Sequence, residues 1–335
     1  MRIVFPDTEI IDRGDIDWSG VEALGELTAF SSSTKEEGIQ RLQEAGAEAV
    51  LIDEYIVDRD VIEACPSLRF IGAAATGYNH IDLEAAAERG IAVCNVPAYS
   101  TEAVAQHAMA LLLALAGQVM PYDREVRAGR WSQEHGRCYE YHPMLLLEGK
   151  SIGIIGYGNI GRKVGDLAKA FGMQVHAYSK DPDAVMNADV ISLNCPLTEE
   201  NRGMVNAEFI SRMKDGAILI NTARGALVDE QALADALKSG KLAGAGVDVT
   251  SPEPPFVGSP QAATSSETSL HAGTSSETSP QAATSSKASP LLTAPNCIIT
   301  PHIAFTPVEI RQRVIDVCVA NLRSYLDGGT LNRII

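Results

Sequence analysis

The chain has 335 residues, of which 45% are hydrophobic, so it is long enough to bury a substantial core, and two domains are expected. Asp and Glu outnumber Lys and Arg by 43 to 27, for a formal net charge of −16, and no basic cluster could follow a phosphate backbone. We therefore expect no nucleic acid partner, and no membrane partner either, since no apolar stretch is a convincing bilayer span.

Short apolar runs alternate with helical patterns over the first hundred residues. Residues 2–6, 49–53, 68–74 and 91–96 (RIVFP, AVLID, LRFIGAA and IAVCNV) predict strands. The segments at 34–46, 60–67 and 83–90 predict helices or helical turns between them. Strands that alternate with helices in this way predict a parallel α/β layer.

The most apolar stretch, AVAQHAMALLLALAG at residues 103–117, predicts a buried helix that begins near Thr101. Gln106 and His107 interrupt it, and it is shorter than a bilayer requires. A second alternating series starts at residue 150 and continues through strands at 189–196, 217–223, 242–249 and 297–304. The predicted fold class is therefore α/β, with two doubly wound parallel-sheet domains.

The last helix has a marked beginning. Thr306 and Glu309 have the spacing of a capping box, and Pro307 fits the first helical position. We expect this helix to run to about Leu326, before the glycines that follow.

The six cysteines lie far apart and show neither CxxC nor CxxH spacing. They are Cys65, Cys94, Cys138, Cys195, Cys297 and Cys318. This pattern predicts reduced thiols in a cytoplasmic protein, with no disulfide framework and no metal site.

The sharpest local signal is the sequence IGIIGYGNIG. Gly156, Gly158 and Gly161 complete a GxGxxG pattern directly after a predicted strand and at the start of a predicted helix. In this context the first glycine permits a tight turn, the second lets backbone approach a pyrophosphate, and the third allows close helix packing. The pattern predicts a dinucleotide cofactor.

The choice between NAD and NADP stays open at this point. An acidic residue usually ends the second strand of such a unit and binds the adenosine ribose, but here Ser179 and Lys180 stand there. Serine would not repel a 2′-phosphate, and the lysine could pair with one. Alternatively, Lys180 is a solvated loop charge, or Asp181 or Asp183 folds back onto the ribose.

Three chemically active side chains follow predicted strands in the second half of the chain. Arg224 lies in LINTARGALVDE, Glu253 in GVDVTSPEPP and His302 in IITPHIA. The carboxyl ends of parallel strands are where open α/β sheets bind ligands. These three residues are therefore candidates for one catalytic site.

At this point the chain resembles the D-isomer-specific 2-hydroxyacid dehydrogenase family over nearly its whole length. The resemblance rests on AATGYNHIDLEAA, NVPAYSTEAVAQH, the glycine pattern, LNCPLTEEN, NTARGALVDEQAL, GVDVTSPEP and PHIA, in family order. Each motif alone is weak, but together they are highly specific.

The resemblance implies catalytic roles. Arg224 would hold the carboxylate and keto oxygen of the substrate, because its fixed fork of donors suits planar oxygens. His302 would donate a proton to the carbonyl oxygen and take it back in the reverse direction. Glu253 would orient the imidazole and favour its protonated form.

Further positions carry over by motif. Family cofactor contacts fall on Thr101, Gly156, Gly158, Asn159, Ile160, Gly161, Ser179, Lys180, Cys195, Pro196, Ala223 and Asp248. Asp248 would meet the nicotinamide amide, and Cys195 is not expected to be a nucleophile. The amides around Ala75, Thr76 and Gly77 resemble the loop that binds the substrate carboxylate together with Arg224.

The resemblance also implies domain roles. Residues 1–98 and 303–335 would form a flavodoxin-like substrate-binding domain, and residues 99–302 a Rossmann domain for NAD or NADP, with the active site in the cleft between them. Residues 121–147, rich in Tyr, Trp and Leu, resemble the arm through which the family dimerises. A homodimer is therefore expected.

A tract rich in Ser, Thr and Ala interrupts this pattern at residues 260–289. It holds three near-copies of a ten-residue unit, beginning at Pro260, Leu270 and Pro280. Such a composition cannot build a core and predicts a disordered insertion in a surface loop. A flexible lid or a phosphorylatable tether is the functional alternative. Without the tract, the chain reads like an uninterrupted family member.

The segments AATGYNHID and VPAYST look most like the glycerate dehydrogenase and hydroxypyruvate reductase branch. The expected substrate pairs are thus hydroxypyruvate with D-glycerate, or glyoxylate with glycolate. Two alternatives stay open: an enzyme like phosphoglycerate dehydrogenase, and a nucleotide-sensing binding protein like the corepressors of this fold.

Overall fold

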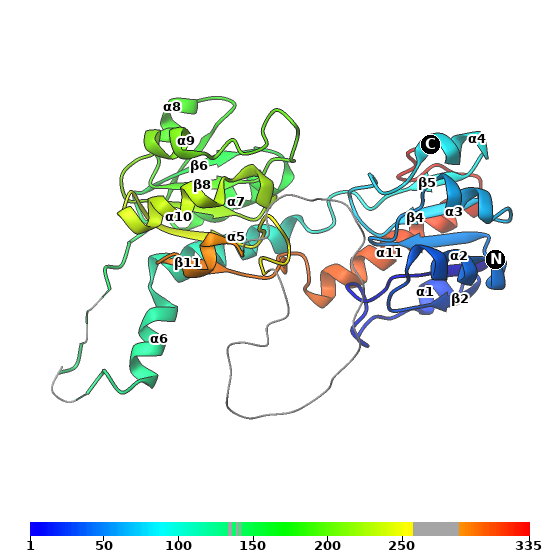
Figure 1. Cartoon of the computed structure of the whole chain (residues 1–335), viewed down its shortest axis with the longest axis horizontal. Helices are drawn as coiled ribbons and strands as arrows, with labels where there is room; N and C mark the ends of the chain where they lie inside the picture. Colours follow the sequence, from blue (N-terminus) through cyan, green and yellow to red (C-terminus); the bar gives the residue numbers. More distant parts are fainter. Residues whose placement is uncertain (133–135, 139, 141, 257–287) are drawn as a thin grey trace. The chain divides into compact units, whose positions relative to one another are not determined.

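The computed structural model describes residues 1–132, 136–138, 140, 142–256 and 288–335. The chain divides into two compact units (Figure 1): unit 1 is Met1–Val104 with Ala304–Ile335, and unit 2 is Ala105–Ile303. Most of the tract at 260–289, and part of the expected arm at 121–147, lie outside the described residues. Each unit has its own parallel sheet flanked by helices, which confirms the predicted fold class.

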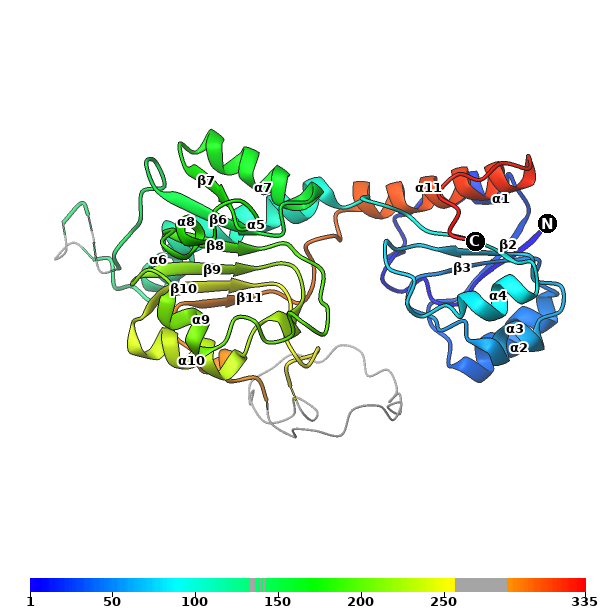
Figure 2. The same ribbon diagram turned by 90° about the horizontal axis from the view of Figure 1, so that it is seen from above.

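Unit 1 is built on five parallel strands in the order β2-β1-β3-β4-β5. The strands are β1 (Arg2–Phe5), β2 (Glu26–Ala29), β3 (Ala49–Ile52), β4 (Phe70–Ala73) and β5 (Ala92–Cys94). The helices are α1 (Ser19–Glu22), α2 (Lys35–Ala45), α3 (Arg59–Ala64), α4 (Leu83–Glu88) and α11 (Val308–Leu326). Figure 2 shows α2, α3 and α4 on one face of this sheet and α1 and α11 on the other.

The central strands of unit 1 are buried on both faces. In β3, Val50 and Ile52 pack into the core beneath α2, α3 and α4, whereas Ala49 and Leu51 pack into the core beneath α11. Each of these side chains is at most 1% exposed. Since side chains alternate between the two faces of a strand, a strand covered on both faces must be apolar throughout, which explains the continuous apolar runs.

Three elements of unit 1 differ from the sequence prediction, and the first is helix α1, which was not anticipated. The strand β2 was not anticipated, because it lies at the sheet edge and its ELTA sequence is only partly buried. Helix α11 ends at Leu326 as predicted, but the predicted capping box is wrong: Pro307 is the N-cap residue and no side chain caps the helix. The carbonyl oxygen of Thr306 instead accepts a hydrogen bond from Arg311 Nε at 2.9 Å.

Unit 2 has six parallel strands in the order β11-β10-β9-β8-β6-β7. They are β6 (Ser151–Ile155), β7 (Gln174–Ala177), β8 (Val190–Leu193), β9 (Ala217–Asn221), β10 (Leu242–Val247) and β11 (Cys297–Ile299). The helices are α5 (Thr101–Ala116), which begins in unit 1, α6 (Val119–Arg127), α7 (Asn159–Ala170), α8 (Pro182–Met186), α9 (Ala207–Arg212) and α10 (Glu230–Ser239). Helices α5 and α7 pack on one face of the sheet, and α8, α9 and α10 on the other.

The strand order of unit 2 changes direction at β6. From β6 the chain pairs β7 on one side and then β8 on the other. At such a switch point the loops that follow the two strands turn to opposite faces and leave a crevice at the carboxyl edge, where doubly wound sheets bind their ligands. The GxGxxG turn follows β6, so the predicted cofactor motif borders this crevice.

No single helix in the described part of the chain is long and apolar enough to cross a bilayer. Helices α5 and α6 reach the length and apolar composition of a membrane span only when they are counted together. The break between them bends the chain by 55°. Much of α5 is buried within the protein cores, as predicted.

The described chain on the two sides of residues 257–287 meets at a hydrogen bond. Ser289 N donates to the carbonyl oxygen of Pro255 at 2.9 Å. The carboxylate of Glu230, which is only 8% exposed, accepts hydrogen bonds from the hydroxyl of Ser289 and from Ser251 N. The two ends of the predicted insertion are therefore held together by described residues alone.

Removing residues 260–289 should leave the fold intact. Ser259 would then precede Pro290 and take the place of Ser289, so the hydrogen bonds to Pro255 and Glu230 can re-form. Because closure entropy depends on the logarithm of loop length, shortening the loop roughly tenfold should stabilise the protein by up to about 2 kcal/mol. Urea unfolding of both proteins measures this difference.

A deletion of residues 259–289 provides the matched control. It removes both serines and leaves Glu230 buried without its hydroxyl partner, which should cost about 1–3 kcal/mol relative to the deletion of 260–289. Equal stability of the two deletions would show that the hydrogen bond between this serine and Glu230 does not stabilise the fold.

Candidate active site

The turn between β6 and α7 is packed too closely for side chains. Gly156 has a φ of 93°, and a Cβ atom there would lie 2.5 Å from the backbone of Asn194 and Cys195. A Cβ atom at Gly161 would lie 2.1 Å from the carbonyl oxygen of Gly156. Position 156 therefore requires glycine because of both its backbone conformation and its close contact. Position 161 requires glycine because of its close contact alone.

Gly158 leaves the amino end of α7 open. It is the N-cap residue, no side chain caps the helix, and no atom lies within 4 Å of the place where its Cβ would be. The N–H groups of Asn159, Ile160 and Gly161 begin the helix, so its positive dipole end points into this space. This cradle fits the pyrophosphate of a dinucleotide.

The loops after β8 and β9 lie at the same edge of the sheet as the glycine turn, because both strands run parallel to β6 in neighbouring positions. Cys195 and Pro196 follow β8, and Ala223 follows β9. Asn194 Oδ1 and Thr222 Oγ1 are buried in these loops with no hydrogen-bond partner among the described residues. Sequence reasoning missed these two residues, whose signal is a polar side chain directly after a buried strand. Unsatisfied polar atoms at a crevice also fit a bound dinucleotide.

The described part of the chain contains no group of side chains suited to bind a metal ion. No group of three or more His, Cys, Asp or Glu residues there could hold a metal ion. All six cysteines are free thiols. Burial raises the pKa of the Cys195 thiol, so this side chain stays protonated and unreactive at neutral pH.

A serine and a lysine stand near the end of β7, and the first carboxylate after the strand is that of Asp181. Ser179 and Lys180 are exposed there. Asp181 Oδ1 accepts a hydrogen bond from Ala184 N at 3.0 Å and so caps α8, and Asp183 lies in the first turn of that short helix. Asp181, which the sequence suggested as a possible acceptor for the ribose hydroxyls, therefore uses one of its oxygens to cap α8.

Glu253 and His302 form a hydrogen bond of 2.9 Å between Oε2 and Nδ1. The other oxygen of Glu253 accepts a hydrogen bond from Thr250 N at 3.0 Å, which fixes the carboxylate. The hydrogen bond to Glu253 raises the pKa of His302 above its ordinary value against the effect of burial, and the charge of Asp248 adds to the rise. Burial acts to raise the pKa of Glu253, but the hydrogen bond from His302 and its charge lower it overall.

His302 occupies an unusual backbone conformation. Its φ is 53°, in the left-handed region, where a residue other than glycine costs about 1–2 kcal/mol. Its N–H donates to the carbonyl oxygen of Asp248 at 2.8 Å. The chain around Asp248 therefore holds the turn in which the imidazole projects.

Arg224 lies on a loop that packs directly against the loop of Glu253. A Cβ atom at Gly225 would lie 2.0 Å from the carbonyl oxygen of Thr250. Arg224 is exposed, and its Nη1 donates to the carbonyl oxygen of Ala223 at 2.7 Å. Its positive charge acts to lower the pKa of His302. The structure thus brings together the three residues that sequence reasoning selected for chemistry.

The expected substrate loop belongs to unit 1. Thr76 Oγ1 donates to the carbonyl oxygen of Val96 at 2.9 Å, and Val96 N donates to the carbonyl oxygen of Ala75 at 3.0 Å. Gly77 is exposed, with open space where a Cβ would be. Thr101 begins α5, also within unit 1, and donates to the carbonyl oxygen of Ala98 at 3.2 Å. These hydrogen bonds fix the loop that follows β4.

Two partly buried carboxyl groups at the same edge of the unit 1 sheet were not anticipated. Asp7, after β1, accepts backbone hydrogen bonds from Asp53, Glu54 and Tyr55 at 2.6–3.2 Å. Burial raises the pKa of Asp7 to about 6 and that of Asp53 to about 7. Their sequence signal is an aspartate that follows each apolar run.

Comparison with known proteins identifies the family that this chain resembles in sequence and structure. A family model described as "D-isomer specific 2-hydroxyacid dehydrogenase, NAD binding domain" matches residues 109–304. A hydroxypyruvate reductase from Blautia hydrogenotrophica is 40% identical over 350 aligned positions that cover 99% of each chain. A glycerate dehydrogenase from Methylorubrum extorquens is 34% identical, over 99% of this chain and 98% of its own. The crystal structure of the TT0316 protein from Thermus thermophilus covers 100% of both chains with a TM-score of 0.78 and 34% identity.

The imidazole of His302 should titrate above its ordinary pKa, because the neighbouring carboxylate favours the charged form. Glu253→Gln removes that charge but keeps the size of the side chain, so the titration midpoint of His302 should fall. NMR of protein labelled with [13Cε1]histidine measures the midpoint, and the resonance is assigned by its loss in His302→Gln.

Glu208→Gln is the control, since Glu208 is an exposed acid on α9 outside these loops. It should leave the midpoint of His302 unchanged. An unchanged midpoint in Glu253→Gln would show that the two side chains are not coupled in solution.

Proposed function

The chain belongs to the D-isomer-specific 2-hydroxyacid dehydrogenase family, and we propose that it reduces hydroxypyruvate to D-glycerate, or glyoxylate to glycolate. It is an oxidoreductase that acts on the CH–OH group of donors with NAD or NADP. The single observation that carries the chemistry is the hydrogen bond between His302 and Glu253, on the sheet that also carries the GxGxxG turn. The names of the relatives favour these two small 2-oxoacids.

Charged groups and hydrogen-bond donors bind the substrate in this proposal. The guanidinium of Arg224 binds the carboxylate and the keto oxygen, because it is always charged and offers paired, planar donors. Its hydrogen bond to Ala223 holds the group in place before substrate arrives. The amides around Ala75, Thr76 and Gly77 add donors for the carboxylate, which assigns substrate binding to unit 1.

His302 moves the proton. The nicotinamide, when bound, supplies the hydride in reduction and receives it in oxidation. Glu253 favours the protonated form of His302, because its hydrogen bond raises the pKa of the imidazole. The protonated His302 gives its proton to the carbonyl oxygen as the carbon gains hydride. In the reverse direction the neutral imidazole accepts the hydroxyl proton.

Unit 2 holds the cofactor in this proposal. The open amino end of α7 binds the pyrophosphate, and Asp248 meets the nicotinamide amide. The remaining proposed contacts in unit 2 fall on Gly156, Gly158, Asn159, Ile160, Gly161, Ser179, Lys180, Cys195, Pro196 and Ala223. Thr101, at the start of α5 in unit 1, is a further proposed contact.

The residues after β7, where the adenosine ribose of the cofactor is proposed to bind, favour NADPH over NADH. Asp181 caps α8 through Oδ1, so one oxygen of the first carboxylate after β7 is already engaged within the protein. Ser179 and Lys180 are both exposed at this point. A hydroxyl and an ammonium group are the donors that a 2′-phosphate requires.

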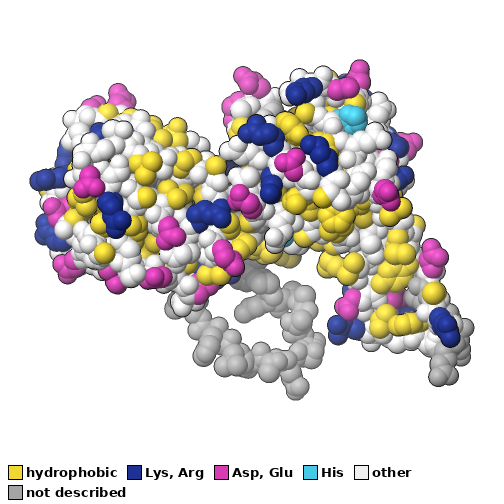
Figure 3. All heavy atoms as spheres, turned by 180° about the vertical axis from the view of Figure 1, so that it is seen from behind, with side chains coloured by type: hydrophobic (Ala, Val, Ile, Leu, Met, Phe, Trp, Pro, Cys, Tyr) yellow, Lys and Arg dark blue, Asp and Glu magenta, His cyan; other side chains and the backbone are white. Residues whose placement is uncertain are grey.

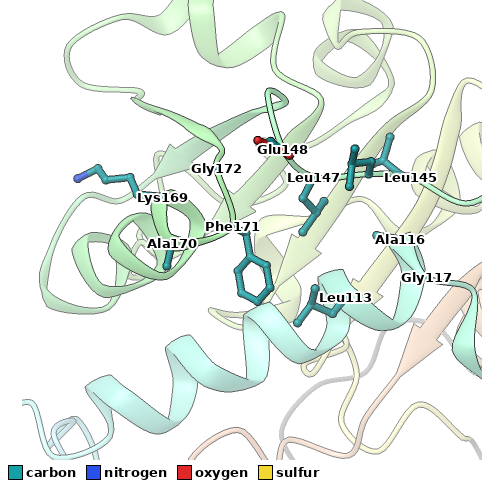
Figure 4. A pocket seen from close by; sticks show the side chains of 11 residues that line it. Leu113, Ala116, Gly117, Leu145, Leu147, Glu148, Lys169, Ala170, Phe171 and Gly172 are labelled. Carbon is teal, nitrogen blue, oxygen red and sulfur yellow. The ribbon is translucent and has the colours of Figure 1, made fainter.

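A homodimer fits the surface around α6. Val119, Met120, Val126, Trp131, Met144 and Leu146 expose 47–73% of their surface here, and Figure 3 shows apolar side chains gathered on this projection. Nearby, Leu113, Leu147 and Phe171 line an open cavity of about 590 Å³ (Figure 4). An apolar surface of this extent is typical of an interface, and we assign it to a second copy of the chain.

The cytoplasm is the proposed location. All six cysteines are free, and several are buried where they behave as small apolar residues. Reduced thiols are the rule in a reducing compartment.

His302→Ala should lower kcat for hydroxypyruvate reduction about 100- to 10,000-fold, because the general acid is lost. In the wild type, kcat/KM for reduction should fall as pH rises through the raised pKa of His302, since only the charged imidazole can donate. Glu253→Gln should move this fall to lower pH. Initial rates with hydroxypyruvate and glyoxylate, measured with each cofactor across pH, test these expectations.

Wild-type protein that binds the dinucleotide but reduces neither oxoacid would overturn the proposed substrates. A rate with 3-phosphohydroxypyruvate alone would favour an enzyme like phosphoglycerate dehydrogenase. No rate with any 2-oxoacid would favour the nucleotide-sensing alternative.

Ser179→Asp should reverse the cofactor preference. A carboxylate at the end of β7 repels the 2′-phosphate of NADPH and can accept the ribose hydroxyls of NADH. We expect kcat/KM for NADPH to fall about tenfold or more while that for NADH is kept. Ser211→Asp, at an exposed serine of α9, is the control. An equal loss with both cofactors would contradict the assignment.

Light scattering should give twice the chain mass of 35.7 kDa at micromolar concentration. Leu146→Glu should shift the mass toward the monomer, because it introduces a charge into the apolar surface around α6. Leu326→Glu, at an exposed leucine of α11, should leave the dimer unchanged. A monomer at all concentrations would exclude the assembly.

A further inference from the structure

A buried carboxylate contacts parts of unit 2 that lie far apart in the sequence. The side chain of Asp248, after β10, is 1% exposed. Its Oδ1 accepts hydrogen bonds from Thr300 Oγ1 at 2.6 Å and from Ile303 N at 2.9 Å, and His107 Nε2 of α5 lies 3.3 Å from the same atom. Donors from α5 and from the turn after β11 therefore converge on one oxygen atom.

The hydrogens in this cluster can be assigned from its geometry. Thr300 has a single hydroxyl hydrogen, which it directs to Asp248 Oδ1. His107 Nε2 lies 2.9 Å from Thr300 Oγ1, which can therefore only accept from the imidazole. Nε2 of His107 thus carries a hydrogen, and the cluster is a chain of donors from His107 through Thr300 to Asp248.

This series of hydrogen bonds ends at the turn that carries His302. The carbonyl oxygen of Asp248 accepts the N–H of His302 at 2.8 Å, and its side chain accepts the next N–H, that of Ile303. Thr300 N donates to the carbonyl oxygen of Val247 at 2.9 Å. One residue therefore fixes two successive peptide groups of a turn whose central φ is 53°.

We propose that His107 and Thr300 are positioning residues of the reaction, which act through Asp248 to hold the turn of His302 so that the imidazole stays on Glu253. The inference rests on the proposed role of His302. His107 itself is not the proton donor, because its side chain is only 19% exposed and its Nε2 is directed at Thr300 and Asp248.

The cluster also defines the charges around His302. Glu253 and Asp248 face the imidazole as negative groups and Arg224 as a positive one. A shift of the turn changes the distance to all three, so the titration of His302 reports its position. A role in general stability alone would not change this titration while the protein remains folded.

The test uses Thr300→Val and His107→Phe, which remove the hydrogen bonds from two different elements. Because small displacements of reacting groups are costly, each should lower kcat for hydroxypyruvate about ten- to a hundredfold, with KM changed less than about threefold. The double variant should lose no more than about the worse single variant, since both act through Asp248. The NMR midpoint of His302 should fall in each, because its hydrogen bond to Glu253 loosens.

Conservative variants supply the rescue. Thr300→Ser keeps the hydroxyl and His107→Gln keeps a donor in the place of Nε2, so both should recover most of the lost kcat and restore the His302 midpoint. Thr293→Val, at an exposed threonine beyond the cluster, should match the wild type in both measurements.

Folded Thr300→Val and His107→Phe proteins with wild-type kcat and an unchanged His302 midpoint would overturn the inference. If Thr300→Val does not fold, His107→Phe decides alone by the same two readouts. If the wild type reduces no 2-oxoacid, the proposed function fails, but the His302 midpoint in these variants still decides whether the cluster positions the imidazole.

Discussion

The hydrogen bonds that Asp248 accepts from the turn at His302 fix where the imidazole lies, and the other parts of the site depend on them. The left-handed backbone of His302 costs about 1–2 kcal/mol, whereas each hydrogen bond to a charged group contributes about 1.5–3 kcal/mol. The bonds that the Asp248 carboxylate accepts from Thr300 and Ile303 therefore outweigh the strain. Glu253 then meets His302, and the loop of Arg224 follows because Gly225 packs on the backbone of the Glu253 loop.

The same sheet sets the distance between the GxGxxG turn and the proposed catalytic residues. Loops after β6, β8, β9 and β10, which are neighbours in the sheet, carry the glycine turn, Cys195, Arg224 and Asp248 in that order. Neighbouring strands are about 4.8 Å apart, so three intervals separate the two ends of this row by roughly 14 Å. Only an extended ligand can touch both ends, as a dinucleotide does. The parallel sheet thus orders the site before any side chain is considered.

Much of this could be predicted from the sequence, and the failures have physical causes. Strands covered on both faces, such as β3, produce continuous apolar runs, and the GxGxxG spacing reflects backbone contacts that exclude any Cβ at Gly156 and Gly161. The edge strand β2 produces no such run, because one side of it is unpaired. The capping box at Thr306 failed because its spacing does not reveal where the helix begins. Asp181 could be assigned to a cap or to a ribose, and only the geometry of α8 separates the two. The cluster of His107, Thr300 and Asp248 joins residues too far apart in sequence for any local pattern.

The hydrogen bond between Pro255 and Ser289 also bears on how this chain can change over evolutionary time. Each ten-residue copy in the tract ends in serine, and a serine also precedes the first copy, so the loss or gain of whole copies always leaves a serine before the Pro290 turn. Replication slippage, which adds or removes repeats in whole units, would therefore alter the length of the chain while the buried Glu230 keeps its partner. The junction behaves as a permissive insertion point. The same property makes it a rational place to graft an affinity tag or a reporter domain.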